Sequence, residues 1–187
     1  MMPTIRYQRP AFRPEPERTL ILSTADAIAA ETVARGRQAA NEARGIKSKK
    51  RDDSRTDIEI HTEGAYGEAG FARLCGGDWF ERWYAIAVNR SPLSQEPDVG
   101  PFHVRACAPD KRLLVKPGDI LQPPYVLVWV RSESATVAFC GWAFGFEIAV
   151  PRYKRDEFKP AIWLRPAETL YGWESLWAWY ASRFGGP

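Results

Sequence analysis

The sequence predicts an α+β fold, in which a small mixed and mainly antiparallel sheet is flanked by helices. The first half carries helix signals, the middle carries short apolar or alternating runs bounded by Pro and Gly, and the tail carries aromatic residues at helical spacing. With 187 residues, 45% of them hydrophobic and 26% charged, the chain is long enough for one domain with a buried core. This composition excludes a fully disordered chain, a collagen-like repeat and a disulfide-stapled miniprotein.

The first predicted helix covers residues 24–43. Ser23 or Thr24 caps its start, and Asp26 lies in its first turn, where a negative charge is favourable. Small apolar side chains form a narrow stripe along this helix, and Gly45 marks its end.

Three further segments precede the strand region. Alternation in residues 57–62 (DIEIHT) predicts a short strand. Residues 64–75 predict a short helix ending at Gly76, and its Gly and Ala residues allow close approach to a neighbouring backbone. Residues 79–88 (WFERWYAIAV) fit a helix or a strand equally well, because their periodicity favours neither.

After Pro97 the pattern turns to strands, at residues 102–108, 112–116, 125–130 and 137–142. The run 125–130 is continuously apolar, which predicts a central strand buried on both faces. In the first strand, alternation places His103 and Arg105 on the face opposite Val104. Alternation continues at Phe144, Phe146, Ile148 and Val150 and predicts one more strand.

The C-terminal segment, residues 171–187, predicts an aromatic helix packed on the core or on a partner. Four aromatic residues share one helical stripe: Trp173, Trp177, Tyr180 and Phe184. The simplest interpretation is that the stripe docks on the protein's own core. The alternative is an interface with another protein or a second copy of the chain, since Trp and Tyr dominate interface hot spots.

The formal net charge is +3, and the whole excess lies in the first 60 residues. We expect a Pro-rich extended arm at residues 1–22 and a core domain at residues 23–170, with a basic loop at residues 44–56. Basic side chains here and after the first strand predict contact with a DNA backbone, with a solvated loop as the alternative. The residues concerned are Lys47, Lys49, Lys50, Arg51, Lys111 and Arg112.

The sequence predicts a cytoplasmic protein without a membrane partner. No apolar run reaches the roughly 20 residues that a membrane-spanning helix needs, and the N-terminus lacks the apolar region of a secretory signal. Cys75, Cys107 and Cys140 are widely spaced, which predicts free thiols in a reducing compartment. A cysteine nucleophile or a zinc site is disfavoured, because only His61 and His103 are available as further ligands.

Three charged residues follow one another in the order expected for a phosphodiester-hydrolysing site: Glu68 in a helix, Asp98 at a strand entrance and Arg105 in the next strand. Carboxylates are the ligands that Mg²⁺ prefers, and the metal activates a bound water and neutralises the phosphoryl group. The neighbours of Glu68 on the helix, Ala65 and Ala72, predict that this acid is buried and therefore needs a partner.

Glu68 in a GAYGE helix, Pro97-Asp98 and the strand His103-Val104-Arg105 resemble the PD-(D/E)XK nuclease superfamily. The segments GAYGEAGFARLCG, PDVGPFHVRA, RLLVKPGDILQPPYVLVWV, CGWAFG and KPAIWLRPAETL resemble a group of uncharacterised phage and prophage proteins with the same core pattern. The resemblance covers about residues 24–170. It implies a restriction-endonuclease-like core, Mg²⁺ or Mn²⁺ held by Glu68 and Asp98, cleavage of DNA, and a bacterial host cell as the location.

The sequence departs from the superfamily pattern at two positions. His103 stands where the family has its second strand acid, and Arg105 stands where it has a lysine. Arg105 cannot act as a base, because a guanidinium stays protonated, but it can clamp a phosphate. Two hypotheses follow: a nuclease with a variant site, in which His103 is a ligand or positions water, and a nuclease fold without catalysis that binds nucleic acid or blocks a host protein. A structural virion component is a third, and each site residue also has an ordinary interpretation as a surface, turn or hydrogen-bonded side chain.

Overall fold

The computed structural model describes residues 18–46, 55–91, 94–107, 112–158 and 160–185. The helices are α1 (Thr24–Ala43), α2 (Asp57–Cys75), α3 (Trp79–Ala87), α4 (Gly145–Ile148) and α5 (Trp173–Phe184). The strands are β1 (Thr19–Ile21), β2 (His103–Cys107), β3 (Leu113–Val115), β4 (Pro124–Arg131), β5 (Thr136–Phe144), β6 (Lys154–Arg155) and β7 (Ile162–Arg165). The fold is mixed α+β with an open, mainly antiparallel sheet flanked by helices, as the sequence predicts.

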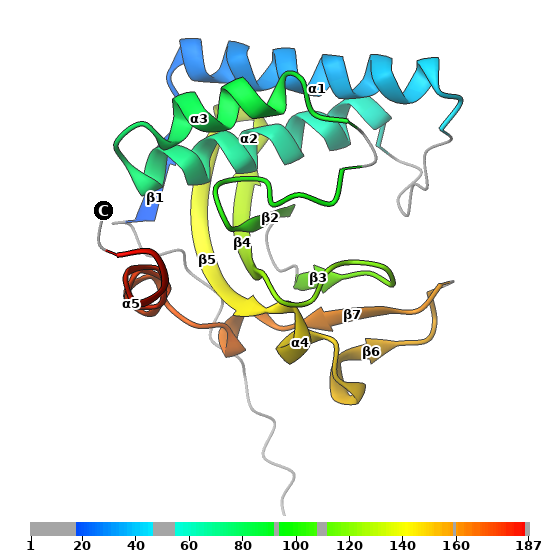
Figure 1. Ribbon diagram of the computed structural model, residues 1–187. Coiled ribbons are helices and arrows are strands. Elements are labelled where there is room, and N and C mark those ends of the chain that lie inside the picture. The colour runs from blue at the N-terminus through cyan, green and yellow to red at the C-terminus, as the bar shows by residue number, and fades with distance from the viewer. Residues whose placement is uncertain (1–17, 47–54, 92–93, 108–111, 159, 186–187) are drawn as a thin grey trace, which may run out of the picture.

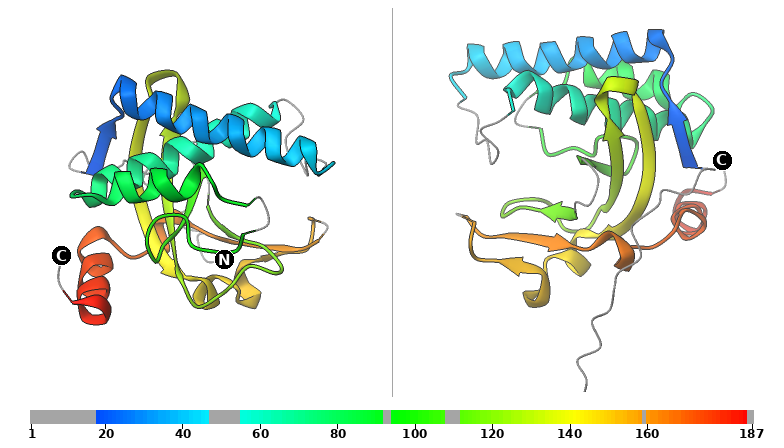
Figure 2. Two further views of the ribbon diagram at one scale, coloured as in Figure 1. Left: turned by 45° about the horizontal axis from the view of Figure 1, so that its top comes forward. Right: turned by 180° about the vertical axis from the view of Figure 1, so that it is seen from behind.

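The main sheet has the strand order β1-β5-β4-β2, in which only β2 and β4 run parallel. A second, antiparallel sheet has the order β3-β7-β6. The helices α1, α2 and α3 form a layer at one end of the molecule, and the long curved strands β4 and β5 run from this layer to the small sheet (Figure 1). The two further views show the helical layer and the small sheet at opposite ends (Figure 2).

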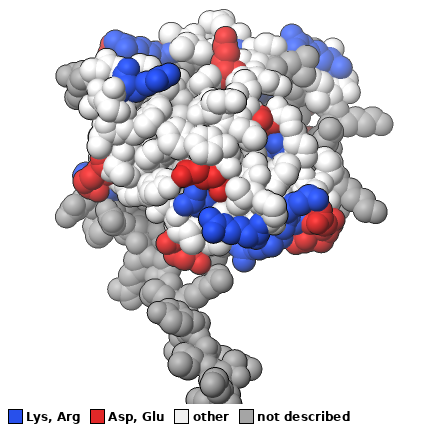
Figure 3. Space-filling model, turned by 60° about the horizontal axis from the view of Figure 1, so that its bottom comes forward, with Lys and Arg blue, Asp and Glu red and all other residues white. Residues whose placement is uncertain are grey.

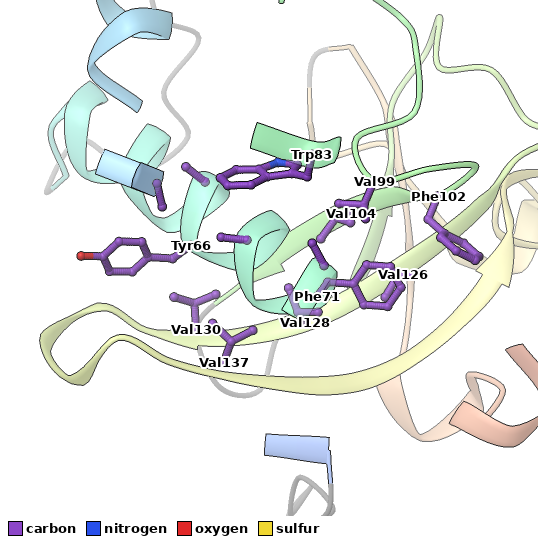
Figure 4. Close-up of a cluster of buried hydrophobic side chains, with 14 of the residues drawn as sticks. Tyr66, Phe71, Trp83, Val99, Phe102, Val104, Val126, Val128, Val130 and Val137 are labelled. Atoms are coloured by element: carbon purple, nitrogen blue, oxygen red, sulfur yellow. The ribbon is translucent and has the colours of Figure 1, made fainter. Parts of the chain in front are cut away.

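Two hydrophobic cores meet at the central strand β4. Its residues Val126 and Val128 belong to the core under the helices, whereas Tyr125 and Leu127 belong to the core toward the small sheet. Figure 4 shows the first core, in which side chains of β4 lie close to Phe71 of α2. The prediction of a central strand buried on both faces is therefore confirmed.

The glycines of α2 allow this helix to lie directly on the main sheet. A Cβ on Gly67 would come within 2.7 Å of the Ala106 Cβ, and a Cβ on Gly70 within 2.5 Å of the Val137 Cβ. Real side chains do not approach so closely, so any larger residue at either position would push α2 away from the sheet. The close approach expected from the small residues of this segment is confirmed.

The helix predicted at residues 24–43 is confirmed, and Ser23 caps it by accepting a hydrogen bond from the Asp26 backbone N–H at 3.1 Å. The strand predicted at residues 57–62 is wrong, because α2 begins at Asp57. The reason is a capping box: Thr56 Oγ1 accepts from the Glu59 backbone N–H, and the Glu59 carboxylate accepts from the Thr56 N–H. Residues 79–88, which the pattern left open, form the helix α3.

The strand predicted at residues 144–150 is also wrong, since the short helix α4 begins at Gly145. A Cβ on Gly145 would lie 2.8 Å from the Leu121 backbone, and the Glu147 carboxylate accepts from the Phe144 N–H at 3.0 Å. The chain therefore turns closely past Leu121 after β5, and the buried residues Gly145 and Ile148 follow the three-residue spacing of a helical turn. The apolar alternation in the sequence does not distinguish a strand from such a helical turn.

The C-terminal helix α5 packs on its own molecule. Trp173 is 8% exposed and Leu176 is fully buried, and the Trp142 indole N–H of β5 donates to Ser175 Oγ at 3.0 Å and to the Gly172 carbonyl at 3.2 Å. The prediction of Trp173 as a partner-interface residue is therefore wrong, because its ring is part of the core. Within the described ranges, no helix combines the length and the apolar character that crossing a membrane requires.

Candidate anion-binding pocket

Glu68 lies in the middle of α2 and is 6% exposed. Arg37 of α1 donates to both of its carboxylate oxygens, Nη1 to Oε1 at 2.8 Å and Nη2 to Oε2 at 2.7 Å. The Trp83 indole N–H of α3 adds a third hydrogen bond to Oε2 at 3.0 Å. A buried carboxylate needs such partners, because desolvation without them is strongly unfavourable. The carboxylate of Glu68 therefore links α2 to both α1 and α3, and both of its oxygens accept hydrogen bonds.

Asp98 lies in the tight turn before β2, where the bridge between Val99 and Phe102 reverses the chain. Its Oδ1 accepts from Arg90 Nη1 at 2.7 Å, and its Oδ2 accepts from the Val104 backbone N–H at 2.8 Å. Burial alone would raise the pKa of Asp98, but the neighbouring His103 and the guanidinium charges of Arg105 and Arg90 outweigh burial and lower this pKa below its usual value. The side chain is thus held as a carboxylate.

His103 and Arg105 share the face of β2 that points away from the helices, as the alternation predicts. The His103 ring is buried and stacks on Tyr125, with centroids 4.8 Å apart, and its Nδ1 lies 3.7 Å from Asp98 Oδ2. Arg105 donates to Asp119 Oδ2 at 3.2 Å and lies 3.8 Å from Asp98 Oδ2. Two buried nitrogens of this pair, His103 Nε2 and Arg105 Nε, have no hydrogen-bond partner. Both residues surround Asp98 but do not face Glu68.

Arg37 connects the two predicted site acids. Burial lowers the pKa of Arg37, but the carboxylate of Glu68 and, more weakly, that of Asp98 raise it above its usual value. The guanidinium is therefore permanently charged and sits in the field of both acids. The structure brings Glu68 and Asp98 into one region, as predicted, but places an arginine where the prediction has a metal ion.

Sequence reasoning missed Arg37 and Arg90. The signal for Arg37 was present, because it continues the buried stripe of α1 at helical spacing after Ala30, Val33 and Ala34. A cation on a buried stripe is the partner that a buried acid in a neighbouring helix requires. Arg90 follows α3 in an irregular segment, where no periodicity marks the direction of a side chain.

A pocket of about 170 Å³ opens between α1 and the segment that follows α3. Its lining residues are Arg37, Arg90, Ser91, Ser94 and Asp98. Asp98 is the only carboxylate among them, and both of its oxygens already accept hydrogen bonds. Each guanidinium has five N–H groups. Arg37 uses two of them on Glu68, and Arg90 uses one on Asp98 and one on the Glu96 carbonyl. The pocket thus has more donors than acceptors and suits an oxyanion.

The residues predicted to hold Mg²⁺ do not fit that ion in this arrangement. All four carboxylate oxygens of Glu68 and Asp98 accept hydrogen bonds from protein N–H groups. A metal ligand presents its oxygen to the ion, which the two guanidinium groups prevent here. Among the residues that the structure describes, no group of three or more His, Cys, Asp or Glu side chains is placed to hold a metal ion.

The predicted nucleic-acid contacts fall mostly outside the described residues. This applies to Lys47, Lys49, Lys50, Arg51 and Lys111. Arg112 is described and is half-buried just before β3. Arg44, at the end of α1, donates to Ser91 Oγ at 3.2 Å and therefore lies at the pocket.

Compared with protein-family models, with curated proteins and with solved structures, the chain matches none of them. The geometry of the site thus carries the functional argument by itself.

Proposed function

We propose that this protein is a non-catalytic binding protein that takes a phosphate group of nucleic acid into the pocket between Arg37 and Arg90. One observation carries the proposal. The carboxylates of Glu68 and Asp98 bind the two guanidinium groups, and both arginines line the pocket with further N–H groups beyond those that the carboxylates use. Guanidinium groups fixed by carboxylates are well suited to bind phosphate oxygens bidentately.

The same contacts argue against hydrolysis. A hydrolytic site needs a group that activates water, and each candidate is engaged elsewhere. Arg105 stays protonated and pairs with Asp119 at 3.2 Å, and the His103 ring is buried against Tyr125. We therefore place the chain with the nuclease-like folds that bind without cleaving, and the restriction-endonuclease-like core remains part of this proposal.

Nucleic acid is the proposed source of the phosphate because the protein carries a net charge of +3, with its excess in the first 60 residues. Arg44, at the start of the basic run 44–55, contacts the pocket residue Ser91. Binding of this kind is insensitive to sequence and weakens as salt concentration rises.

Fluorescence anisotropy with labelled DNA tests the proposal. Arg90→Lys keeps the charge beside Asp98 but loses the paired N–H donors of the planar guanidinium. We therefore expect its affinity for DNA to fall at least about fivefold, as for loss of a charge-assisted hydrogen bond. Arg82→Gln is the matched control, because Arg82 of α3 is an exposed arginine that pairs with Asp78, the residue before this helix. Equal affinity of Arg90→Lys and the wild type, with both folded, rejects the pocket.

A metal-dependent nuclease is the second candidate. It is favoured by the single observation that Glu68 and Asp98 both act on Arg37 and so lie in one region. For Mg²⁺ or Mn²⁺ to bind these acids, Arg37 would have to leave them. Incubation of single- and double-stranded DNA and RNA with either metal tests this candidate. If the wild type cleaves and both Glu68→Gln and Asp98→Asn do not, the protein is a nuclease and the proposal of a non-catalytic binding protein is wrong.

A further inference from the structure

A second surface with ligand-binding chemistry lies on the small-sheet side of the molecule. It is formed by α4, the 3-10 turn Pro151–Tyr153, the strand β6 and the segment before α5. Figure 3 shows Lys and Arg side chains gathered in a band on this side, with acidic side chains next to them and uncharged surface around them. None of these elements contributes a residue to the arginine pocket.

Two aromatic rings on this surface are exposed and firmly supported. Phe146 is 54% exposed and stacks on Phe144, with centroids 5.2 Å apart and planes at 9°. Tyr171 is 41% exposed, and its hydroxyl donates to Glu147 Oε1 at 2.7 Å. The buried Trp142 contacts both Phe144, at 5.2 Å, and Tyr171, at 5.3 Å. The two exposed rings are thus joined through one rigid aromatic cluster.

Cations continue the aromatic cluster. The guanidinium of the buried Arg165 lies 5.3 Å from the Tyr171 ring and 5.9 Å from the Tyr153 ring. Arg152 is exposed, and its guanidinium lies 4.8 Å from the centroid of the same Tyr153 ring. Within the described part of the chain, neither Arg152 nor the half-buried Arg155 forms an ion pair with an acid. Their charges are therefore available to a ligand.

We propose that this surface binds single-stranded nucleic acid, with bases stacked on Phe146 and Tyr171 and phosphates against Arg152 and Arg155. Exposed π faces next to unpaired arginines match the two chemical features of a single strand, its bases and its backbone. A duplex hides its base faces within the stack and offers only its phosphates. The proposal extends the proposed function, since it names the strand type, but its contacts do not involve Arg37 or Arg90.

The test compares two labelled oligonucleotides of about 20 nucleotides, a size that covers the binding surface of a small domain. One carries thymine bases and the other is abasic, with the same number of phosphates. We expect the wild type to bind the thymine strand at least about fivefold more tightly, the lower limit for one stacked base. Phe146→Ala lowers this difference, because only Tyr171 is left for stacking, and leaves binding of the abasic strand unchanged. Phe184→Ala is the control, because Phe184 of α5 is equally exposed, at 55%.

Two further variants separate this proposal from the pocket. Arg152→Gln weakens both strands alike and lowers the salt dependence of binding by about one unit, as for one lost phosphate contact. Arg90→Lys weakens both strands but keeps the preference for bases. The proposal is rejected if the thymine and abasic strands bind equally, if Phe146→Ala leaves the preference as large as in the wild type, or if a duplex of the same length binds as tightly. In each of these cases a loss of affinity in Arg90→Lys would still support the pocket.

Discussion

The arginines at the two ends of the molecule have different surroundings. At the helical end, Arg37 and Arg90 are matched by the buried carboxylates of Glu68 and Asp98. At the small-sheet end, Arg152 faces an aromatic ring and has no acid beside it in the described structure. The first arrangement orients guanidinium groups through fixed carboxylates, and the second leaves a guanidinium whose charge no carboxylate of the described residues balances. Net charge alone therefore says little about where such a protein binds.

Removing Glu68 should give the largest effect. We expect Glu68→Ala to lower the free energy of unfolding by about 3–5 kcal/mol, because it leaves the Arg37 charge largely buried without its partner. Arg152→Ala at the other end should change it by less than about 0.5 kcal/mol, as for an exposed residue. Denaturant unfolding measures both. Equal losses in the two variants would remove the contrast between the two ends.

The aromatic stripe of α5 should divide into a core part and a surface part. We expect Trp173→Ala to lower the free energy of unfolding by about 3–5 kcal/mol, since its ring packs on Phe71 and Phe139. Phe184→Ala should lower it by less than about 1 kcal/mol, because that side chain is mostly exposed. Thermal and denaturant unfolding provide the measurement. A small loss for Trp173→Ala would mean that α5 docks elsewhere.

Two glycine substitutions test how closely the helical layer lies on the sheet. Gly70→Ala forces a Cβ against Val137 and should lower the free energy of unfolding by about 1–3 kcal/mol. Gly36→Ala is the control, because a Cβ there meets nothing within 4 Å, and it should raise the free energy by up to about 1 kcal/mol. If both substitutions stabilise the protein, α2 does not press on β5.

The smallest expected effect is the pH dependence that comes from Asp98. Its pKa is lower in the folded than in the unfolded protein, so its contribution to stability is complete above the unfolded value of about 4 and is lost as pH falls through the folded value. Asp98→Asn should therefore flatten the curve of unfolding free energy against pH below about pH 4. A curve with the slope of the wild type would show that Asp98 is not held as a carboxylate by its neighbours.

Most of the elements were predictable because their signals are local. The Ser23 cap, the apolar run of β4 and the small residues of α2 each fix one element through short-range chemistry. The errors at residues 57–62 and 144–150 arise where a two-residue alternation coincides with a helix start. In both places a glutamate three residues after the N-cap residue, Glu59 or Glu147, accepts a hydrogen bond from the backbone N–H of that N-cap residue.

The site was predictable only in part. That Glu68 is buried and needs a partner followed from its helix neighbours, and the structure supplies Arg37 as that partner. The identity of the partner depends on how α1 crosses α2, and the position of Arg90 depends on an irregular segment, so neither follows from local pattern. The Mg²⁺ site, the contacts with DNA and a homodimer or protein partner through Trp177, Tyr180 and Phe184 stay predictions.

The most direct test of the central claim is a crystal structure of the protein soaked in separate experiments with Mn²⁺ and with inorganic phosphate. The account predicts phosphate density between Arg37 and Arg90, and no anomalous signal for Mn²⁺ between Glu68 and Asp98. An Mn²⁺ peak bound by these two carboxylates, with Arg37 displaced, would contradict it.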